Sequence, residues 1–306
     1  LSVNAHGRYI GQGALVHSVL ALRLLCADGS ILTLSPQHQP EIFYAVIGGY
    51  GGLGVILDVS LQLADNIRVA RDHLDMPAAE YPAWFAQEIR NNPQVIFHNA
   101  DLFPPDYQAV RAVSWRETDL PVTVTARLHP RQQDHRLNAR LADFVADYQA
   151  GKWLRQHVFE PLVYRTPAVH WRNYEASYDV AELEPASRTE TTYALREYFV
   201  PVAHFAEFTH LMSDIFQRYQ VNVLNVSVRH AKPDPHTLLS WSPQETFAFV
   251  VYYRQGTDQQ SQNQVDEWSR AMIDAALSVG GRYYLPYQPS ATPQQFARAY
   301  PGIDKF

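Results

Sequence analysis

One strand-like segment carries polar residues that could act together on a ligand. Residues 222–230 read NVLNVSVRH, and their alternation places Asn225, Ser227 and Arg229 on one face of a strand. These three side chains could therefore contact one ligand together. The alternative for Arg229 is a solvated or salt-bridged strand residue.

Two further side chains are candidates for the same kind of site. Glu197, in the strand-like segment REYFVP, could act as a base or be a surface charge. Tyr252 lies in the strand-like segment 247–253. A tyrosine there could equally line a pocket or pack at the edge of the core. The chain has 18 Tyr and 6 Trp, and this aromatic content favours a pocket for a flat or sugar-like ligand.

Length and charge narrow the class of protein. The 306 residues allow one large or two modest domains. The formal net charge of −6 provides no basic patch, which argues against nucleic acid as the main partner. No apolar run approaches the roughly 20 residues of a membrane span. The single cysteine, Cys26, is predicted to be buried and unreactive, and a reducing, cytoplasmic location fits it.

Two other kinds of catalytic site find no support in the sequence. The histidines lack H-x-x-x-H spacing and cysteine partners, and C-x-x-C is absent, so we expect no metal site. The G-x-S-x-G motif of serine hydrolases is also absent. A G-x-G-x-x-G loop between strand and helix is missing too, which argues against a Rossmann-type nucleotide site.

Hydrophobic periodicity and turn signals predict a mixed α+β protein. The expected strands span residues 20–26, 31–34, 55–63, 95–103, 109–118, 122–128, 192–200, 221–230 and 246–254. The turn signal Asp28-Gly29 between the first two predicts a hairpin. The expected helices span residues 41–46, 79–90, 137–153, 202–219 and 262–279. A last short helix is expected to have Thr292 as its N-cap and Pro293 at its first position. Residues 154–188 are expected to be irregular. Between residues 67 and 275 this pattern predicts an antiparallel sheet covered by helices on one face.

Several motifs resemble one flavoprotein family. They are VNAHG at residues 3–7, ADG, SP followed by Glu-Ile-Phe, GGYGGLGVI at residues 48–56, and GGRYYLPY with the ATPQQF helix and AYPGIDKF at residues 280–306. Together they resemble the vanillyl-alcohol-oxidase-type flavoproteins, which have a PCMH-type FAD-binding domain. The most similar branch holds the alditol oxidases, the aldonolactone oxidases and decaprenylphosphoryl ribose oxidase.

The resemblance implies three regions. Residues 1–66 would be the second subdomain of the FAD-binding domain, residues 67–279 the substrate or cap domain, and residues 280–306 a segment that returns to the FAD domain. The family's N-terminal FAD subdomain would lie upstream of VNAHG, so we expect this chain to lack it. On their own these residues are then expected to bind FAD weakly or not at all.

The resemblance also assigns residues to the cofactor. Asn4, Ala5, His6 and Gly7 would lie along the isoalloxazine and ribityl groups, with backbone N–H groups toward flavin N1/O2. Ser2 and Val3 would also bind the cofactor. His6 is the titratable group there; its alternative is a structural role. Close backbone approach to the adenosine half would come from Gly51, Gly54, Val55 and Ile56, which an ordinary glycine-rich turn also explains.

Two departures from the family bear on the chemistry. Arg229 falls where the alditol oxidases place a substrate-binding Arg, but Ser227 replaces a Glu of those enzymes. Tyr287 replaces a Lys, and Tyr284 stands where an aromatic residue or His occurs. As a hypothesis, Tyr287 or Tyr284 assists removal of the hydroxyl proton, which requires a depressed tyrosine pKa, for example through Arg229.

The resemblance thus implies an FAD-dependent oxidoreductase, an oxidase or dehydrogenase. It would transfer hydride from a CH–OH group of a sugar-like or polyol substrate to flavin N5 and pass the electrons to oxygen or another acceptor. One alternative is a truncated, non-catalytic fragment or subunit that completes an FAD site with a separate N-terminal polypeptide. Another is a binding module that uses an aromatic pocket.

Overall fold

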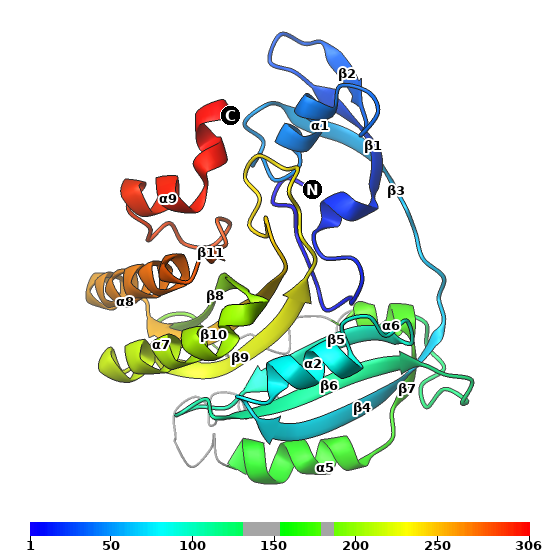
Figure 1. Cartoon of the computed structure of the whole chain (residues 1–306), viewed down its shortest axis with the longest axis vertical. Helices are drawn as coiled ribbons and strands as arrows, with labels where there is room; N and C mark the ends of the chain where they lie inside the picture. Colours follow the sequence, from blue (N-terminus) through cyan, green and yellow to red (C-terminus); the bar gives the residue numbers. More distant parts are fainter. Residues whose placement is uncertain (131–153, 179–186) are drawn as a thin grey trace.

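The chain is arranged around two antiparallel sheets that face each other across its N-terminal segment (Figure 1). This description comes from a computed structural model and covers residues 1–130, 154–178 and 187–306. The smaller sheet lies at the top of Figure 1 and the larger one below it, with residues 1–14 running between them. The mixed α+β class predicted from the sequence is confirmed.

The smaller sheet has three strands in the order β2-β1-β3. Its elements are β1 (Val19–Leu25), β2 (Ile31–Leu34), α1 (Pro40–Val46) and β3 (Val55–Leu61), preceded by a short 3-10 helix over Leu15–Ser18. β1 and β2 form the predicted hairpin, whose turn is closed by hydrogen bonds between Cys26 and both Gly29 and Ser30. Apolar residues of α1, β1 and β2 pack together beneath this sheet.

The larger sheet has eight strands in the order β11-β8-β10-β9-β5-β6-β4-β7, and every pairing is antiparallel. Its strands are β4 (Arg68–Pro77), β5 (Val95–Leu102), β6 (Ala109–Glu117), β7 (Val169–Trp171), β8 (Thr191–Pro201), β9 (Asn222–Ala231), β10 (Thr246–Gly256) and β11 (Arg282–Tyr283). The helices between and after them are α2 (Tyr81–Glu88), α5 (Glu160–Arg165), α6 (Arg172–Ala176), α7 (Phe205–Arg218), α8 (Gln259–Ser278) and α9 (Pro293–Ala299).

The two faces of the larger sheet have different partners. Side chains alternate along each strand, so Val226 and Val228 of β9 lie on one face and Ser227 and Arg229 on the other. The first face packs against α2, α7 and α8 in the main hydrophobic core. The second face lies toward the smaller sheet and the N-terminal segment, where Phe199 joins the core of the smaller sheet. This second face carries the site described below.

Most predicted elements are confirmed, with differences that have local causes. Helix α8 begins three residues earlier than expected, because the Asp258 carboxylate accepts a hydrogen bond from the Ser261 N–H and caps it. Thr292 caps α9 as predicted, and with Gln295 it forms a capping box. The predicted strand at 122–128 is wrong: the Thr123 hydroxyl takes the place of a ladder partner for the Val169 N–H, at 3.1 Å. Cys26 is half-buried rather than fully buried.

Other differences arise where the amino-acid composition of a segment lacks the pattern typical of its secondary structure. Strand β4 was not predicted, because charged residues such as Arg71, Asp72 and Asp75 interrupt its apolar pattern. The segment expected to be irregular contains α5, β7 and α6. The predicted helix at 137–153 lies outside the described residues. Within the described part of the chain, no helix is long and apolar enough to span a membrane.

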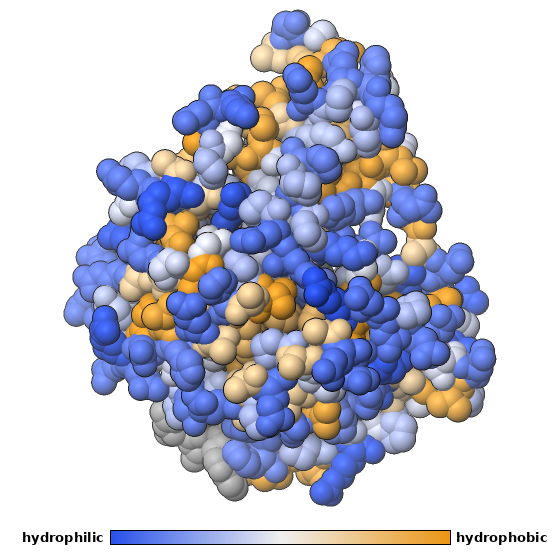
Figure 2. Space-filling model, in the orientation of Figure 1, coloured by the Kyte–Doolittle hydropathy of each residue, from blue (hydrophilic) through white to orange (hydrophobic). Residues whose placement is uncertain are grey.

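Apolar side chains remain exposed on the smaller sheet. In the space-filling view they gather over the upper part of the molecule, around β1–β3 (Figure 2). They include Leu20, Ile31, Val55, Leu57 and Leu61. Such a patch is typical of a surface that another structure covers.

A buried histidine makes stability depend on pH. Nε2 of His98 lies 3.0 Å from the Tyr81 hydroxyl and Nδ1 lies 2.9 Å from the Ser114 hydroxyl. Burial, with smaller effects of His230 and Arg116, lowers the pKa of His98 from 6.5 to about 3. Below pH 6.5 His98 is therefore protonated in the unfolded chain but stays neutral in the folded chain. The stability of the folded state is highest above pH 6.5 and falls as the pH drops toward 3.

We expect His98 to lower the free energy of unfolding by about 2 kcal/mol between pH 7 and pH 5. Urea unfolding at the two pH values measures this loss. The variant His98→Gln has no ionisable group at this position. Its loss of stability between the two pH values should therefore be smaller than that of the wild type by about 2 kcal/mol. Equal losses in the wild type and the variant would contradict the assignment.

Candidate functional site

Asn4 fixes the N-terminal segment against the larger domain. Its backbone has a positive φ of 46° and its side chain is buried. The amide Nδ2 donates to Asp234 at 3.0 Å, Oδ1 accepts from the Val16 N–H at 2.9 Å, and the backbone oxygen accepts from the Trp241 indole at 2.9 Å. The Asn4 N–H itself donates to the Leu1 oxygen. Asn4 therefore does not offer its N–H to a ligand, in contrast to the sequence-based expectation.

The next three residues leave their backbone donors free. Among the described residues, no acceptor pairs with the N–H groups of Ala5, His6 or Gly7. Ala5 and Gly7 are exposed, and a Cβ placed on Gly7 would meet no atom within 4 Å. Free donors on an open stretch of backbone fit a flavin edge, which gains negative charge on reduction. The segment predicted to hold FAD is thus compatible with it.

His6 and Glu197 form a buried pair beside these donors. His6 Nε2 lies 2.6 Å from Glu197 Oε1, and the two side chains are 3% and 4% exposed. The imidazole packs against Phe199 and Trp241, with ring centroids 5.4 and 4.8 Å apart. No described residue pairs with His6 Nδ1, although that atom is buried. Glu197 is therefore no surface charge, and the pair has a free nitrogen to offer a ligand.

Tyr284 and Tyr287 lie next to this pair, but with pKa values opposite to the expected shift. Their rings meet edge to face at 5.7 Å, and the Tyr284 hydroxyl donates to the Val3 oxygen at 2.9 Å. Burial first, and then Glu197, raise the pKa of both hydroxyls; Arg229 lowers that of Tyr287 by less. The expectation that the pKa of Tyr287 is depressed is wrong, because desolvation outweighs the lowering by Arg229. A tyrosine with a raised pKa is a hydrogen-bond donor rather than a base.

The cross-strand register brings the substrate candidates onto one face. Glu197 and Ser227 flank Val250 in one row of paired residues, and Asn225 pairs with Tyr252 in a second row. Paired residues of an antiparallel ladder point to the same side. Asn225 also donates to the Asp101 carboxylate at 3.1 Å.

Arg229 lies on the same face, across from Ala248. Its Nε is buried and has no hydrogen-bond partner among the described residues. Nor does any carboxylate there form an ion pair with it. The alternative of a salt-bridged strand residue is therefore wrong within the described part of the chain, and the guanidinium is available to a ligand.

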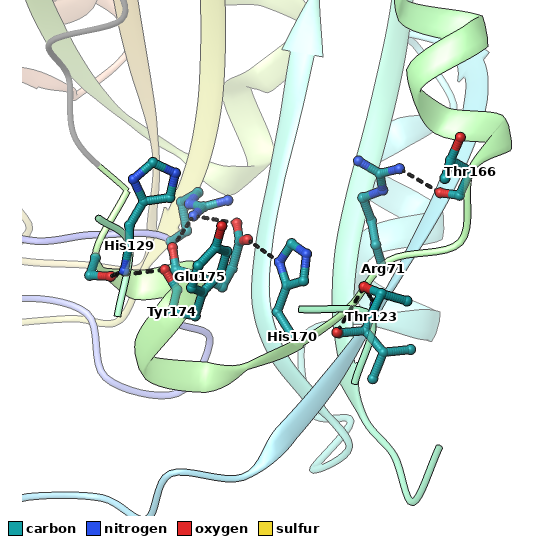
Figure 3. A network of polar contacts seen from close by, with 10 residues as sticks. Arg71, Thr123, His129, Thr166, His170, Tyr174 and Glu175 are labelled. Atoms are coloured by element: carbon teal, nitrogen blue, oxygen red, sulfur yellow. Dashed lines mark hydrogen bonds and ion pairs between the residues drawn. The ribbon is translucent and has the colours of Figure 1, made fainter. Parts of the chain in front are cut away.

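A cavity of about 720 Å³ opens beside Arg229 and Gly7. Its other lining residues are Arg8, Tyr9, Arg71, Phe97, Asn99, Val113, Trp115, Tyr164, His170, Glu175, Ala176 and Tyr178. At its rim the Glu175 carboxylate accepts from Arg8 at 2.8 Å and lies 3.2 Å from His170 Nδ1. Figure 3 shows the His170 ring turned toward Glu175. The cavity joins the cofactor segment to the polar face of the sheet.

The second group of predicted cofactor residues lies apart from this cavity. Gly54 has a φ of 147°, and a Cβ there would lie 2.4 Å from the Leu25 oxygen, so packing on β1 already requires glycine. Val55 is exposed and Ile56 packs in the core of the smaller sheet. Gly51 has a φ of 80° and open space around it. This loop is tied to the N-terminal segment, because the Tyr50 N–H donates to the Ser2 oxygen.

Sequence reasoning missed several residues of the site. The pairing of Arg8 with Glu175 and the anchoring of Asn4 by Asp234 join residues far apart in the chain, and no local pattern marks them. Asn99 had a usable signal, because Phe97 and Asn99 alternate along β5 as Ser227 and Arg229 do along β9. In residues 1–130, 154–178 and 187–306, no group of three His, Cys, Asp or Glu side chains is arranged to hold a metal ion.

Known proteins resemble parts of this chain. No protein-family model matches it. Cytokinin dehydrogenase 2 from Arabidopsis thaliana is 35% identical over 79 residues, which are 26% of this chain and 13% of that protein. L-gulonolactone oxidase from Bos taurus is 33% identical over 119 residues, covering 34% of this chain and 27% of that protein. The chain thus matches only a minor part of these curated relatives.

A solved structure matches nearly the whole chain. Cholesterol oxidase from B. sterolicum superposes with a TM-score of 0.57 and 15% sequence identity, over 95% of this chain and 63% of that one. At this identity the match shows the fold, which is that of part of a flavoprotein oxidase. The local sequence matches relate parts of this chain to FAD-linked oxidoreductases, aldonolactone oxidases among them.

Proposed function

We propose that this chain carries the substrate side and part of the cofactor side of an FAD-dependent oxidoreductase acting on CH–OH groups of sugar-like or polyol substrates. One observation carries the proposal: Gly7 and Arg229 line one cavity, and neither the Gly7 N–H nor the Arg229 Nε has a partner among the described residues. The buried His6–Glu197 pair adjoins Gly7 in the chain and lies on the same face of the sheet as Arg229. The partial matches to FAD-linked oxidoreductases support the cofactor. FAD, when bound, accepts the hydride at N5.

The protein's own residues divide the remaining work. Arg229 binds and polarises the substrate hydroxyl through charge-assisted hydrogen bonds. Glu197 takes the hydroxyl proton as the hydride leaves, and His6 holds the carboxylate in place through its 2.6 Å contact. Tyr287, whose pKa is raised by burial, donates a hydrogen bond instead of accepting a proton. The backbone N–H groups of residues 5–7 hold the flavin edge. With FAD bound, the electrons would pass on to oxygen or another acceptor.

The visible absorption spectrum of the purified protein, with and without added FAD, tests the cofactor part of this proposal. We expect added FAD to show shifted flavin bands that saturate with protein, because the free donors of residues 5–7 contact the flavin edge. Bands identical to those of free FAD at every protein concentration would contradict it.

A second candidate function is a non-catalytic subunit that completes an FAD site with a separate polypeptide. The exposed apolar side chains of the smaller sheet favour it, because a partner would cover them. Binding and reduction of FAD by this chain alone would exclude the subunit role. Flavin bands that shift only after a second polypeptide is added would favour it.

A further inference from the structure

We propose that the cavity beside Gly7 takes a substrate that carries an anionic oxygen group, a carboxylate or a phosphate, in addition to the CH–OH group. This inference rests on the proposed function and names its substrate class. It starts from the charged side chains that line the cavity, which are Arg8, Arg71, Glu175 and Arg229. Glu175 neutralises Arg8 through the 2.8 Å ion pair. Two guanidinium groups remain.

Arg71 is held in place without being neutralised. One terminal nitrogen donates to the backbone oxygens of Val163 and Thr166, at 2.8 and 2.9 Å, and the group lies over the Tyr164 ring. Figure 3 shows Arg71 directed at Thr166. Carbonyl groups and an aromatic ring orient a guanidinium but leave its full charge. No carboxylate of the described residues forms an ion pair with Arg71.

Arg229 lines the same cavity, as Gly7 does. Its Nε is buried and has no partner among the described residues, which is energetically unfavourable. A bound anion would supply the missing partner. Among the described residues, the acidic side chains of β4 and β5 form no ion pair with it. Asp75 pairs with Arg111, Asp72 lies 3.8 Å from Arg116, and Asp101 accepts from Asn225.

The walls of the cavity fit the carbon skeleton of such a substrate. Phe97, Trp115, Tyr164 and Tyr178 supply aromatic surface, and Asn99 supplies an amide. Aromatic faces pack against the C–H groups of sugars, while two cationic side chains select for negative charge. A neutral polyol would leave both guanidinium groups without a counter-charge. An aldonate or a sugar phosphate would provide one.

Isothermal titration calorimetry with three six-carbon probes tests this inference without relying on turnover. The probes are glucitol, gluconate and glucitol 6-phosphate, which share a polyhydroxylated chain and differ in charge. We expect at least one anion to bind about tenfold more tightly than glucitol, since a charge-assisted contact is worth about one decade in affinity. The anion that binds more tightly identifies the group as a carboxylate or a phosphate.

The variant Arg71→Gln should remove most of this preference by weakening the binding of the anion. Arg68→Gln is the matched control, because it removes the same charge from the same strand at a position that does not line the cavity. Equal affinity for glucitol and both anions, or no binding of either anion, would overturn the inference, and this comparison needs only the wild type. If neutral polyols reduce the flavin and the titrations show no preference for an anion, this inference fails and the proposed function stands. Anion preference without flavin reduction would overturn that function alone.

Discussion

Replacing Glu197 by Gln is expected to lower the rate of flavin reduction by substrate by about 10²–10⁴-fold, the usual contribution of a general base. The carboxylate is buried, 2.6 Å from His6 Nε2, and lies on the same row of the sheet as Ser227. An amide of the same shape keeps the packing but cannot accept the proton. Stopped-flow absorbance of the flavin-loaded protein, mixed with substrate in the absence of oxygen, measures this rate.

The structure offers a matched control for this variant. Glu245 forms a similar pair with His230, at 2.8 Å, on the opposite face of the sheet. Glu245→Gln should therefore leave the rate within a factor of a few of the wild type, because it changes a carboxylate–imidazole pair away from the cavity. If Glu197→Gln reduces its flavin as fast as Glu245→Gln does, Glu197 is not the base.

Replacing Arg229 by Met is expected to lower kcat/KM by about 10²-fold, since loss of a charged hydrogen-bonding partner in a desolvated site costs about 2–5 kcal/mol. The guanidinium has no ion pair among the described residues, so its removal breaks no structural contact of that kind. The melting temperature should therefore stay the same or rise. This split between activity and stability distinguishes a binding residue from a structural one.

The variant Arg229→Lys makes the test more specific, because lysine keeps the positive charge but cannot form the bidentate hydrogen bonds of a guanidinium group. We expect its kcat/KM to lie between those of the wild type and Arg229→Met. Steady-state kinetics and thermal unfolding of the three proteins provide both readouts. A kcat/KM of Arg229→Met within twofold of the wild type, or a large fall in its melting temperature, would contradict the assignment.

Local patterns predicted most of the fold. Alternation identified β9 and β10, the Asp28–Gly29 turn marked the first hairpin, and Thr292 with Pro293 marked the start of α9. Each of these signals acts within a few residues. Strand β4 was missed because it is held by its pairing with β6 and β7 rather than by its own apolar residues.

The site could be predicted in its parts but not in its connections. The sequence indicated that Ser227 and Arg229 share a face, and the resemblance pointed to His6. The contact of His6 with Glu197 spans 191 positions, and that of Arg8 with Glu175 spans 167. Such contacts depend on how the two sheets meet. The raised pKa of Tyr287 likewise follows from burial, which no local pattern reports.

The proposed account is tested most directly by mixing the FAD-loaded chain with polyols, aldonolactones and their anionic counterparts in the absence of oxygen. It predicts that the visible bands of oxidised flavin bleach with at least one of these substrates, and that oxygen or another acceptor restores them. Flavin that stays oxidised with all of them, while the chain remains folded and FAD remains bound, would contradict hydride transfer from a CH–OH group at this site.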